Sequence, residues 1–153
     1  MSDIPNSLHS VALVVGAGDA TGGAVARRFA REGFKTCVVR RKAARLLPLV
    51  QQIEDAGGRA YAFAADARKE NEVIELVEQV EETVGPIDVA VFNIGANVPS
   101  SIVDETARRY FKIWELACFA GFLTGREVAK RMVPRGRGTI IFTGATGSLR
   151  GSA

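Results

Sequence analysis

A cluster of glycines near the N-terminus has the spacing of a turn that binds phosphate groups. The apolar run Val11–Val15 leads into glycines at positions 16, 18, 22 and 23, and an amphipathic helical pattern follows. In a strand–turn–helix unit of this kind the glycines let the backbone approach a ligand. The free N–H groups at the helix start then favour negative charge. The sequence therefore predicts a site for a nucleotide pyrophosphate, and a tight turn without a ligand is the alternative.

Two glycine fingerprints each fail at one position. The pattern G-x-G-x-x-G from Gly16 requires a glycine where Thr21 stands. The pattern G-x-x-x-G-x-G requires one where Ala20 stands, and alanine is the smallest substitute. A bare glycine match is weak evidence, so the prediction depends on the strand before the turn and the helix after it.

Arginines follow the second apolar strand. Arg40 and Arg41 come roughly 20 residues after the glycine turn, where dinucleotide-binding folds place the residue that reads the ribose. An acidic residue there accepts from the 2′-hydroxyl of NAD, whereas arginine suits the 2′-phosphate of NADP. Two arginines and no acid favour NADP over NAD. A solvated basic loop continuing through Lys42 and Arg45 is the alternative.

Polar residues also follow the next two strands. Asp66 comes after the apolar segment Arg59–Ala64, and Asn93 comes after Ile87–Phe92. Open α/β sheets bind ligands outside the carboxyl ends of their strands. We predict that Asp66 accepts from the adenine amino group and that the backbone from Asn93 to Gly95 lies near the adenosine. Taken singly, each side chain is better explained as a turn or cap residue.

Strands and helices alternate along the whole chain. The expected strands are Val11–Val15, 34–39, Arg59–Ala64, Ile87–Phe92 and 139–143, and the expected helices are 22–32, 46–56, 70–84 and 104–132. This alternation predicts an α/β fold with a doubly wound parallel sheet and helices on both faces. At 153 residues, the chain from 1 to 153 is predicted to be a single domain.

Composition argues against several other classes of protein. The net charge is only +3 and the arginines are scattered, so no nucleic-acid interface is predicted. No apolar run approaches the roughly 20 residues that span a bilayer, and no signal-peptide pattern is visible, so a cytoplasmic protein without a membrane partner is expected. Cys37 and Cys118 lie in apolar segments and are predicted to be buried free thiols. No Cys/His cluster has metal-ligand spacing, so no metal is predicted.

The long helix predicted from Asp104 to Met132 is apolar around most of its middle. A helix of this kind is buried on more than one side. Since few elements of a short chain remain to cover it, we expect a homo-oligomer that forms through this helix. A helix covered entirely by its own domain is the alternative.

Together these motifs resemble the short-chain dehydrogenase/reductase family. The turn is similar to the family's T-G-x-x-x-G-x-G, with Val15 in place of Thr and Ala20 in place of Gly. Arg40-Arg41 resembles the family's NADP-preferring variants, Asp66-Ala67 resembles its Asp-Val at the adenine, and the segment 92–95 resembles a variant of its N-N-A-G. The resemblance implies a Rossmann-like sheet in the order 3-2-1-4-5, without the last two strands of the family fold. The implied cofactor-binding residues are Gly16, Gly18, Asp19, Ala20, Thr21, Gly22, Arg40, Arg41, Asp66, Ala67, Asn93, Ile94 and Gly95.

The activity implied by the resemblance is hydride transfer between NADP(H) and a small-molecule carbonyl or alcohol. In this family a Tyr of a Y-x-x-x-K motif moves the proton, an Asn supports it and a Ser binds the substrate oxygen. Neither Tyr61 nor Tyr110 has a Lys four residues later, and Ala117 stands at the Asn position.

The family's Ser position falls near Ala145, so the hydroxyls of Thr146 and Ser148 are the candidate catalytic groups. We therefore expect the cofactor-binding portion of a longer oxidoreductase, a truncated domain that is catalytically incomplete by itself. A non-catalytic dinucleotide-binding or interaction protein of the same fold is the alternative.

Overall fold

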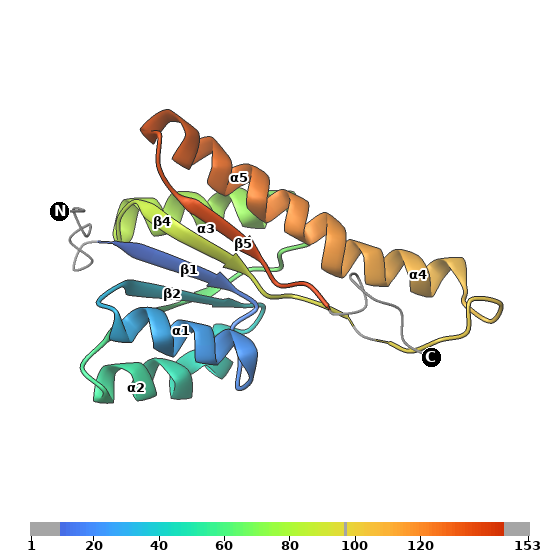
Figure 1. Cartoon of the computed structure of the whole chain (residues 1–153), viewed down its shortest axis with the longest axis horizontal. Helices are drawn as coiled ribbons and strands as arrows, with labels where there is room; N and C mark the ends of the chain where they lie inside the picture. The colour runs from blue at the N-terminus through green and yellow to red at the C-terminus, as the bar shows by residue number, and fades with distance from the viewer. Residues whose placement is uncertain (1–9, 97, 146–153) are drawn as a thin grey trace.

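Five parallel strands form a sheet at the centre of the computed structural model, which describes residues 10–96 and 98–145 (Figure 1). They are β1 (Val11–Val15), β2 (Lys35–Arg40), β3 (Arg59–Ala64), β4 (Ile87–Phe92) and β5 (Thr139–Phe142). Their order across the sheet is β3-β2-β1-β4-β5, and every neighbouring pair is parallel. The predicted doubly wound topology and strand order are confirmed.

Helices cover both faces of this sheet. Helices α1 (Thr21–Arg31) and α2 (Leu47–Asp55) lie on one face, and α3 (Glu70–Thr83) and α5 (Ala120–Arg135) lie on the other (Figure 1). A 3-10 turn at Ala43–Leu46 precedes α2. Helix α4 (Ala107–Trp114) continues through a π-helical turn, Glu115–Phe119, into α5 and projects past the end of the sheet (Figure 1).

Strand β1 is buried along its whole length because it lies between β2 and β4 and between two helical layers. Such a central parallel strand needs a nearly continuous apolar run, which the segment VALVV supplies. The register pairs Val15 with Val39 on one side and with Phe92 on the other. The chain segments after β1, β2 and β4 therefore emerge level with one another.

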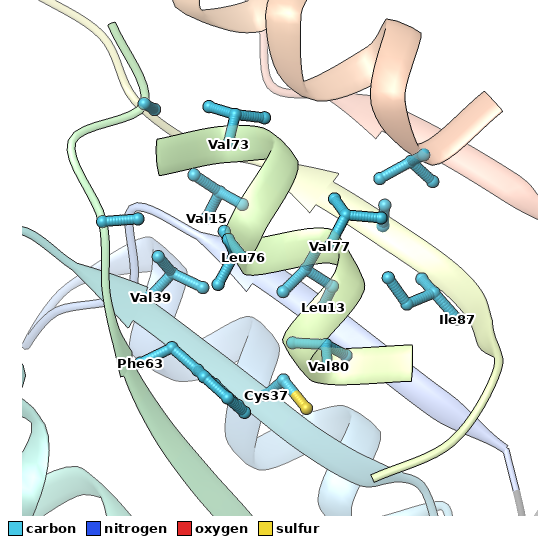
Figure 2. Close-up of a cluster of buried hydrophobic side chains, with 14 of the residues drawn as sticks. Leu13, Val15, Cys37, Val39, Phe63, Val73, Leu76, Val77, Val80 and Ile87 are labelled. Carbon is cyan, nitrogen blue, oxygen red and sulfur yellow. The ribbon is translucent and has the colours of Figure 1, made fainter. Parts of the chain in front are cut away.

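Helix α3 shows how the larger core is built (Figure 2). Its apolar residues recur every three or four positions, which places them on one face above the sheet. That face packs on side chains from β1, β2 and β3 (Figure 2). The labelled members of this core are Leu13, Val15, Cys37, Val39, Phe63, Val73, Leu76, Val77, Val80 and Ile87.

Some boundaries differ from the predicted ones. Arg40 is the last residue of β2 and not the first residue after it, because it pairs with Ala64 of β3. The long helix begins at Ala107, since the Thr106 hydroxyl accepts a hydrogen bond from the Arg109 backbone N–H at 3.2 Å. It ends three residues beyond Met132, at Arg135, before Gly136 in a left-handed conformation.

The described part of the chain does not cover the long helix by itself. No residue of α4 or of the π turn is buried, and the exposed fractions of Phe111 and Trp114 are 56% and 40%. Within the described residues, the segment 107–119 is therefore only partly covered, and both the association through this helix and its alternative stay predictions. The prediction that Cys118 is buried is also wrong, because this thiol lies on an exposed face of the π turn, whereas Cys37 is buried.

The two cysteines should differ sharply in reactivity. Burial raises the pKa of the Cys37 thiol to about 12, and the charge of Lys35 only partly offsets this. Since the thiolate is the reactive form, iodoacetamide at pH 8 should label Cys118 in the folded protein and Cys37 only after unfolding. Mass spectrometry of digested samples reads this out, and Cys118→Ser should leave the folded protein unlabelled. Comparable labelling of both thiols without denaturant would contradict this packing.

Candidate cofactor-binding site

A cleft with a volume of about 270 Å³ opens at the carboxyl ends of the strands. Its floor is the turn after β1, and its walls come from the segments after β2, β3 and β4 and from the π turn. The level strand ends bring these segments together although they lie far apart in sequence. The lining residues are Val15, Gly16, Ala17, Gly18, Val39, Arg40, Arg41, Ala65, Asp66, Ala67, Arg68, Asn93, Ile94, Gly95 and Leu116.

The turn after β1 is locked against its neighbours. Gly16 has a φ of 88°, and a Cβ at this position would lie 2.7 Å from the carbonyl oxygen of Asn93. The backbone N–H groups of Gly16 and Ala17 donate to the Val39 carbonyl at 3.1 and 3.2 Å, and the Asn93 amide donates to the Gly16 carbonyl at 3.3 Å. Side chains are thus excluded where the backbone must be open to a ligand.

The two glycines at the start of α1 let the helix close on this turn. A Cβ on Gly22 would lie 2.9 Å from the Ala17 Cα. A Cβ on Gly23 would overlap the carbonyl oxygen of Gly18. Gly23 was not among the predicted site residues, although the glycine doublet in the sequence was the signal for it. At Gly18 a Cβ would find ordinary contact, 3.6 Å from the Arg40 Cζ.

The first turn of α1 has no acidic side chain and no side-chain cap. Ala20 occupies the N-cap position. The first N–H groups of a helix have no partner within it and carry the positive end of its dipole. Asp19 and Thr21 are exposed and, like Ala20 and Gly22, lie beside the cleft and do not line it.

A group of cations stands next to the glycine turn. Arg40 and Arg41 line the cleft and, with Lys42 and Arg45, also line an adjoining hollow of about 490 Å³. Within residues 10–96 and 98–145, none of these four side chains forms an ion pair, whereas most other arginines of the described chain have a carboxylate partner. An unpaired cluster of this kind suits an anionic ligand, and arginine can bind phosphate bidentately.

Asp66 is placed as predicted, but its carboxylate is already bound. The Arg68 guanidinium donates to it through Nε at 2.9 Å and through Nη2 at 2.6 Å. This hydrogen bonding lowers the pKa of Asp66 to about 2, against the opposing effect of burial. The resulting stability is complete above the ordinary pKa of 3.8 and is lost as the pH falls to about 2. Arg68 was not predicted, although its spacing of two residues from Asp66 allows this pairing.

The segment after β4 closes the cleft on the side of the long helix. The Asn93 backbone N–H donates to the Val15 carbonyl at 2.8 Å, which extends the β1–β4 ladder past Phe92. The Ile94 side chain packs against the core, and its Cγ1 would lie only 2.7 Å from a Cβ on Gly16. A Cβ on Gly95 would have open space around it. Asn93, Ile94 and Gly95 all line the cleft, and their predicted closeness to an adenosine stays a prediction.

The remaining candidate residues are Thr146, Ser148, Tyr61, Tyr110 and Ala117. Thr146 and Ser148 fall outside the described residues. Tyr61 on β3 and Tyr110 on α4 do not line the cleft. Ala117 lies within the π turn. Among the residues that the structure describes, no group of Cys, His, Asp and Glu side chains could hold a metal ion.

A second hollow, of about 320 Å³, lies between α1 and α2. Arg27, Arg31 and Gln52 line it together with Gly57 and Gly58. Gly33 and Gly58 precede β2 and β3, so this hollow lies toward the amino ends of the strands. It is therefore separate from the rim where the predicted residues meet.

The residues of the cleft fit a dinucleotide. The turn leaves no room for a side chain at Gly16, and free N–H groups and unpaired arginines stand on either side of it. A pyrophosphate requires such a backbone cradle at a helix start. The walls from Asp66 and from Asn93 leave space beyond the cradle for a nucleoside.

Comparison with known proteins agrees with this geometry. The sequence model of the family described as "short chain dehydrogenase" matches residues 10–153. The chain belongs to the short-chain dehydrogenase family. Its glycine turn, its strand order and its cleft therefore correspond to the cofactor-binding half of this family's fold.

Relatives and solved structures of this family align with nearly the whole chain. A short-chain dehydrogenase/reductase from Armillaria gallica is 33% identical over 97% of this chain and 58% of its own length. The crystal structure of a short-chain dehydrogenase from Rhodopseudomonas palustris is 46% identical, with a TM-score of 0.88 over 95% of this chain and 68% of that one. A mutant actinorhodin polyketide ketoreductase solved with NADPH is 30% identical, with a TM-score of 0.89 over 94% of this chain and 56% of that one.

The chain spans about half the length of the curated relatives it matches. In the part of this short-chain dehydrogenase sequence that the structure describes, no helix has both the length and the apolar character needed to cross a membrane.

The glycine turn should tolerate no added methyl group at its tightest point. Gly23→Ala should lower the free energy of unfolding by about 2 kcal/mol, because the turn must open to accept the Cβ beside the Gly18 carbonyl. Gly144→Ala is the matched control, since a Cβ there meets nothing within 4 Å. Urea unfolding followed by circular dichroism measures both variants. Equal stability of the two would contradict the close approach seen here.

Proposed function

We propose that the chain is the cofactor-binding part of an NADP-dependent short-chain oxidoreductase that transfers hydride between NADP(H) and a carbonyl or alcohol. The observation that carries the proposal is the position of Arg40 and Arg41, unpaired within the described chain, at the end of β2 beside the glycine turn. This is where a dinucleotide fold reads the 2′ position of the ribose. The solved ketoreductase that contains NADPH supports the same choice of cofactor.

Each wall of the cleft has a part in this proposal. The turn from Gly16 to Gly22 and the start of α1 bind the pyrophosphate through backbone N–H groups and the helix dipole. Arg40 and Arg41 bind the 2′-phosphate. Asp66 with Ala67, and the segment from Asn93 to Gly95, enclose the adenosine. When bound, the nicotinamide supplies the hydride chemistry.

The proton chemistry needs groups beyond the cleft. We propose the hydroxyls of Thr146 and Ser148, which come shortly after β5 in sequence, as the groups that bind the substrate oxygen. Among the described residues no tyrosine lines the cleft that could serve as the proton donor of this family. The chain of 153 residues is therefore proposed to bind its cofactor without turning over a substrate by itself.

The exposed face of the long helix supports self-association. Phe111, Trp114, Phe119 and Phe122 form a row of rings with neighbouring centroids 5.7, 5.6 and 6.3 Å apart. The exposed fraction of Phe122 is 55%, and that of Phe111 is 56%. An exposed apolar patch of this kind marks an interaction site. We propose that a second copy of the chain covers it.

Cofactor preference should follow the arginines. NADPH should bind at least about tenfold more tightly than NADH, since a hydrogen-bonded charge pair contributes about 1.5–3 kcal/mol. Arg41→Ala should narrow this ratio, because it should weaken the binding of NADPH and leave the binding of NADH unchanged. Arg59→Ala, which removes the same charge at the start of β3, is the control and should leave the ratio unchanged. Fluorescence titration of each reduced nucleotide gives the dissociation constants.

Equal affinities of the unmodified chain for NADPH and NADH would contradict the assignment of Arg40 and Arg41. Binding of neither nucleotide would contradict the proposed function itself. Sustained oxidation of NADPH by the 153-residue chain with simple ketones or aldehydes would contradict its proposed catalytic incompleteness.

Light scattering at micromolar concentration should show a dimer or a larger assembly. Phe122→Glu should lower the measured mass, because it places a charge within the row of rings. Leu47→Glu is the control: Leu47 is also exposed, at 61%, but lies on α2 at the other face of the sheet. A monomeric unmodified chain, or equal masses for both variants, would argue against association through this helix.

A further inference from the structure

The carboxylate of Asp66, which the sequence predicted to accept from the adenine amino group, has most of its hydrogen-bonding capacity occupied. Oδ1 accepts from the backbone N–H of Arg68 at 3.2 Å and from its Nε at 2.9 Å, and Oδ2 accepts from Nη2 at 2.6 Å. A carboxylate offers about four acceptor positions. Since only 13% of the Asp66 side chain is exposed, little of the carboxylate is open to a base.

Arg68 itself stands in the cleft. It lines the cleft beside Asp66, and Leu116 of the π turn lines the same cavity. Its Nη1 lies 3.8 Å from the Glu115 carboxylate, beyond hydrogen-bonding distance, so this donor remains available to a ligand. The guanidinium is thus held between the loop after β3 and the long helix. A guanidinium plane in this position can stack on any purine, whatever the substituents at its edge.

We propose that Arg68 sets the base specificity of the cleft. Because Arg68 holds the Asp66 carboxylate, the part of the cleft that receives the base binds a purine equally well whether position 6 carries an amino or an oxo group. While Arg68 holds the carboxylate, Asp66 cannot distinguish a 6-amino donor from a 6-oxo acceptor, and stacking on the guanidinium plane is available to both purines. This inference rests on the proposed binding of NADP. It makes Arg68, and not Asp66, the residue that meets the base.

The test compares NADPH with its reduced hypoxanthine analogue by fluorescence titration of the 153-residue chain. The affinities of the unmodified chain for the two nucleotides should lie within about threefold of each other, because the cleft has no free carboxylate that could distinguish the edges of the two bases. Arg68→Met frees the carboxylate and should favour NADPH by about tenfold. Arg31→Met is the control: Arg31 is exposed at the end of α1, outside the cleft, and its loss should leave the ratio unchanged.

Two further measurements separate this role from a purely structural one. NMR titration of the Asp66 carboxyl should show its pKa rising from about 2 toward its ordinary value in Arg68→Met, which establishes that the carboxylate has been freed. Asp66→Asn should leave the near-equal binding of the two nucleotides unchanged, because the carboxylate does not read the base while Arg68 holds it.

The outcomes separate this inference from the proposed function. If the unmodified chain binds NADPH and prefers it over the hypoxanthine analogue by tenfold or more, the inference is overturned while the proposed function stands. An unchanged ratio in Arg68→Met, with the Asp66 pKa raised, also overturns it. If the unmodified chain binds neither nucleotide, both proposals fall together.

Discussion

The close approach of the glycine turn to the segments around it is the constraint on which the site depends. Gly16 sits against the Asn93 backbone, and Gly23 against the Gly18 carbonyl, with no room for a Cβ at either position. This approach requires β1 to be level with β2 and β4, which in turn requires the buried apolar run of β1. The cleft at the strand ends is therefore a consequence of how the central strand packs.

Charge in the cleft is divided between paired and unpaired groups. Arg68 forms an ion pair with Asp66 in the part of the cleft that is proposed to bind the adenosine. Arg40 and Arg41 form no ion pair within the described chain, although the charge of Arg41 contributes to lowering the pKa of Asp66, and both stand beside the glycine turn. Because an unpaired cluster of cations repels itself, a bound phosphate would stabilise this part of the fold as well as being held by it. The cations that could bind a phosphate thus lie apart from the Asp66–Arg68 pair, where a base is proposed to bind.

Much of the fold could be predicted from the sequence because the spacing of apolar residues distinguishes strands from helices, and because the glycines lie between a strand and a helix. The runs in β1 and β4, the glycine turn and the apolar face of α3 identified the parallel sheet correctly, and the resemblance to the family supplied its strand order. What depends on contacts in space was not predicted: the glycine doublet and the spacing of Arg68 from Asp66 are visible in the sequence, but only the structure shows that Gly23 meets the Gly18 carbonyl and that Arg68 binds Asp66. The exposure of Cys118 was also missed, because an apolar stretch of helix indicates burial without showing which partner provides it. The roles of Thr146 and Ser148 stay predictions.

The central claim is that the cleft at the carboxyl ends of the strands binds a dinucleotide on the glycine turn. Chemical-shift mapping of the backbone amides with NADPH tests it most directly. If the dinucleotide binds there, the largest changes should occur at Gly16, Gly18, Arg41 and Gly95, around the cleft. Changes centred on Gly57 and Gly58, in the hollow between α1 and α2, would contradict it.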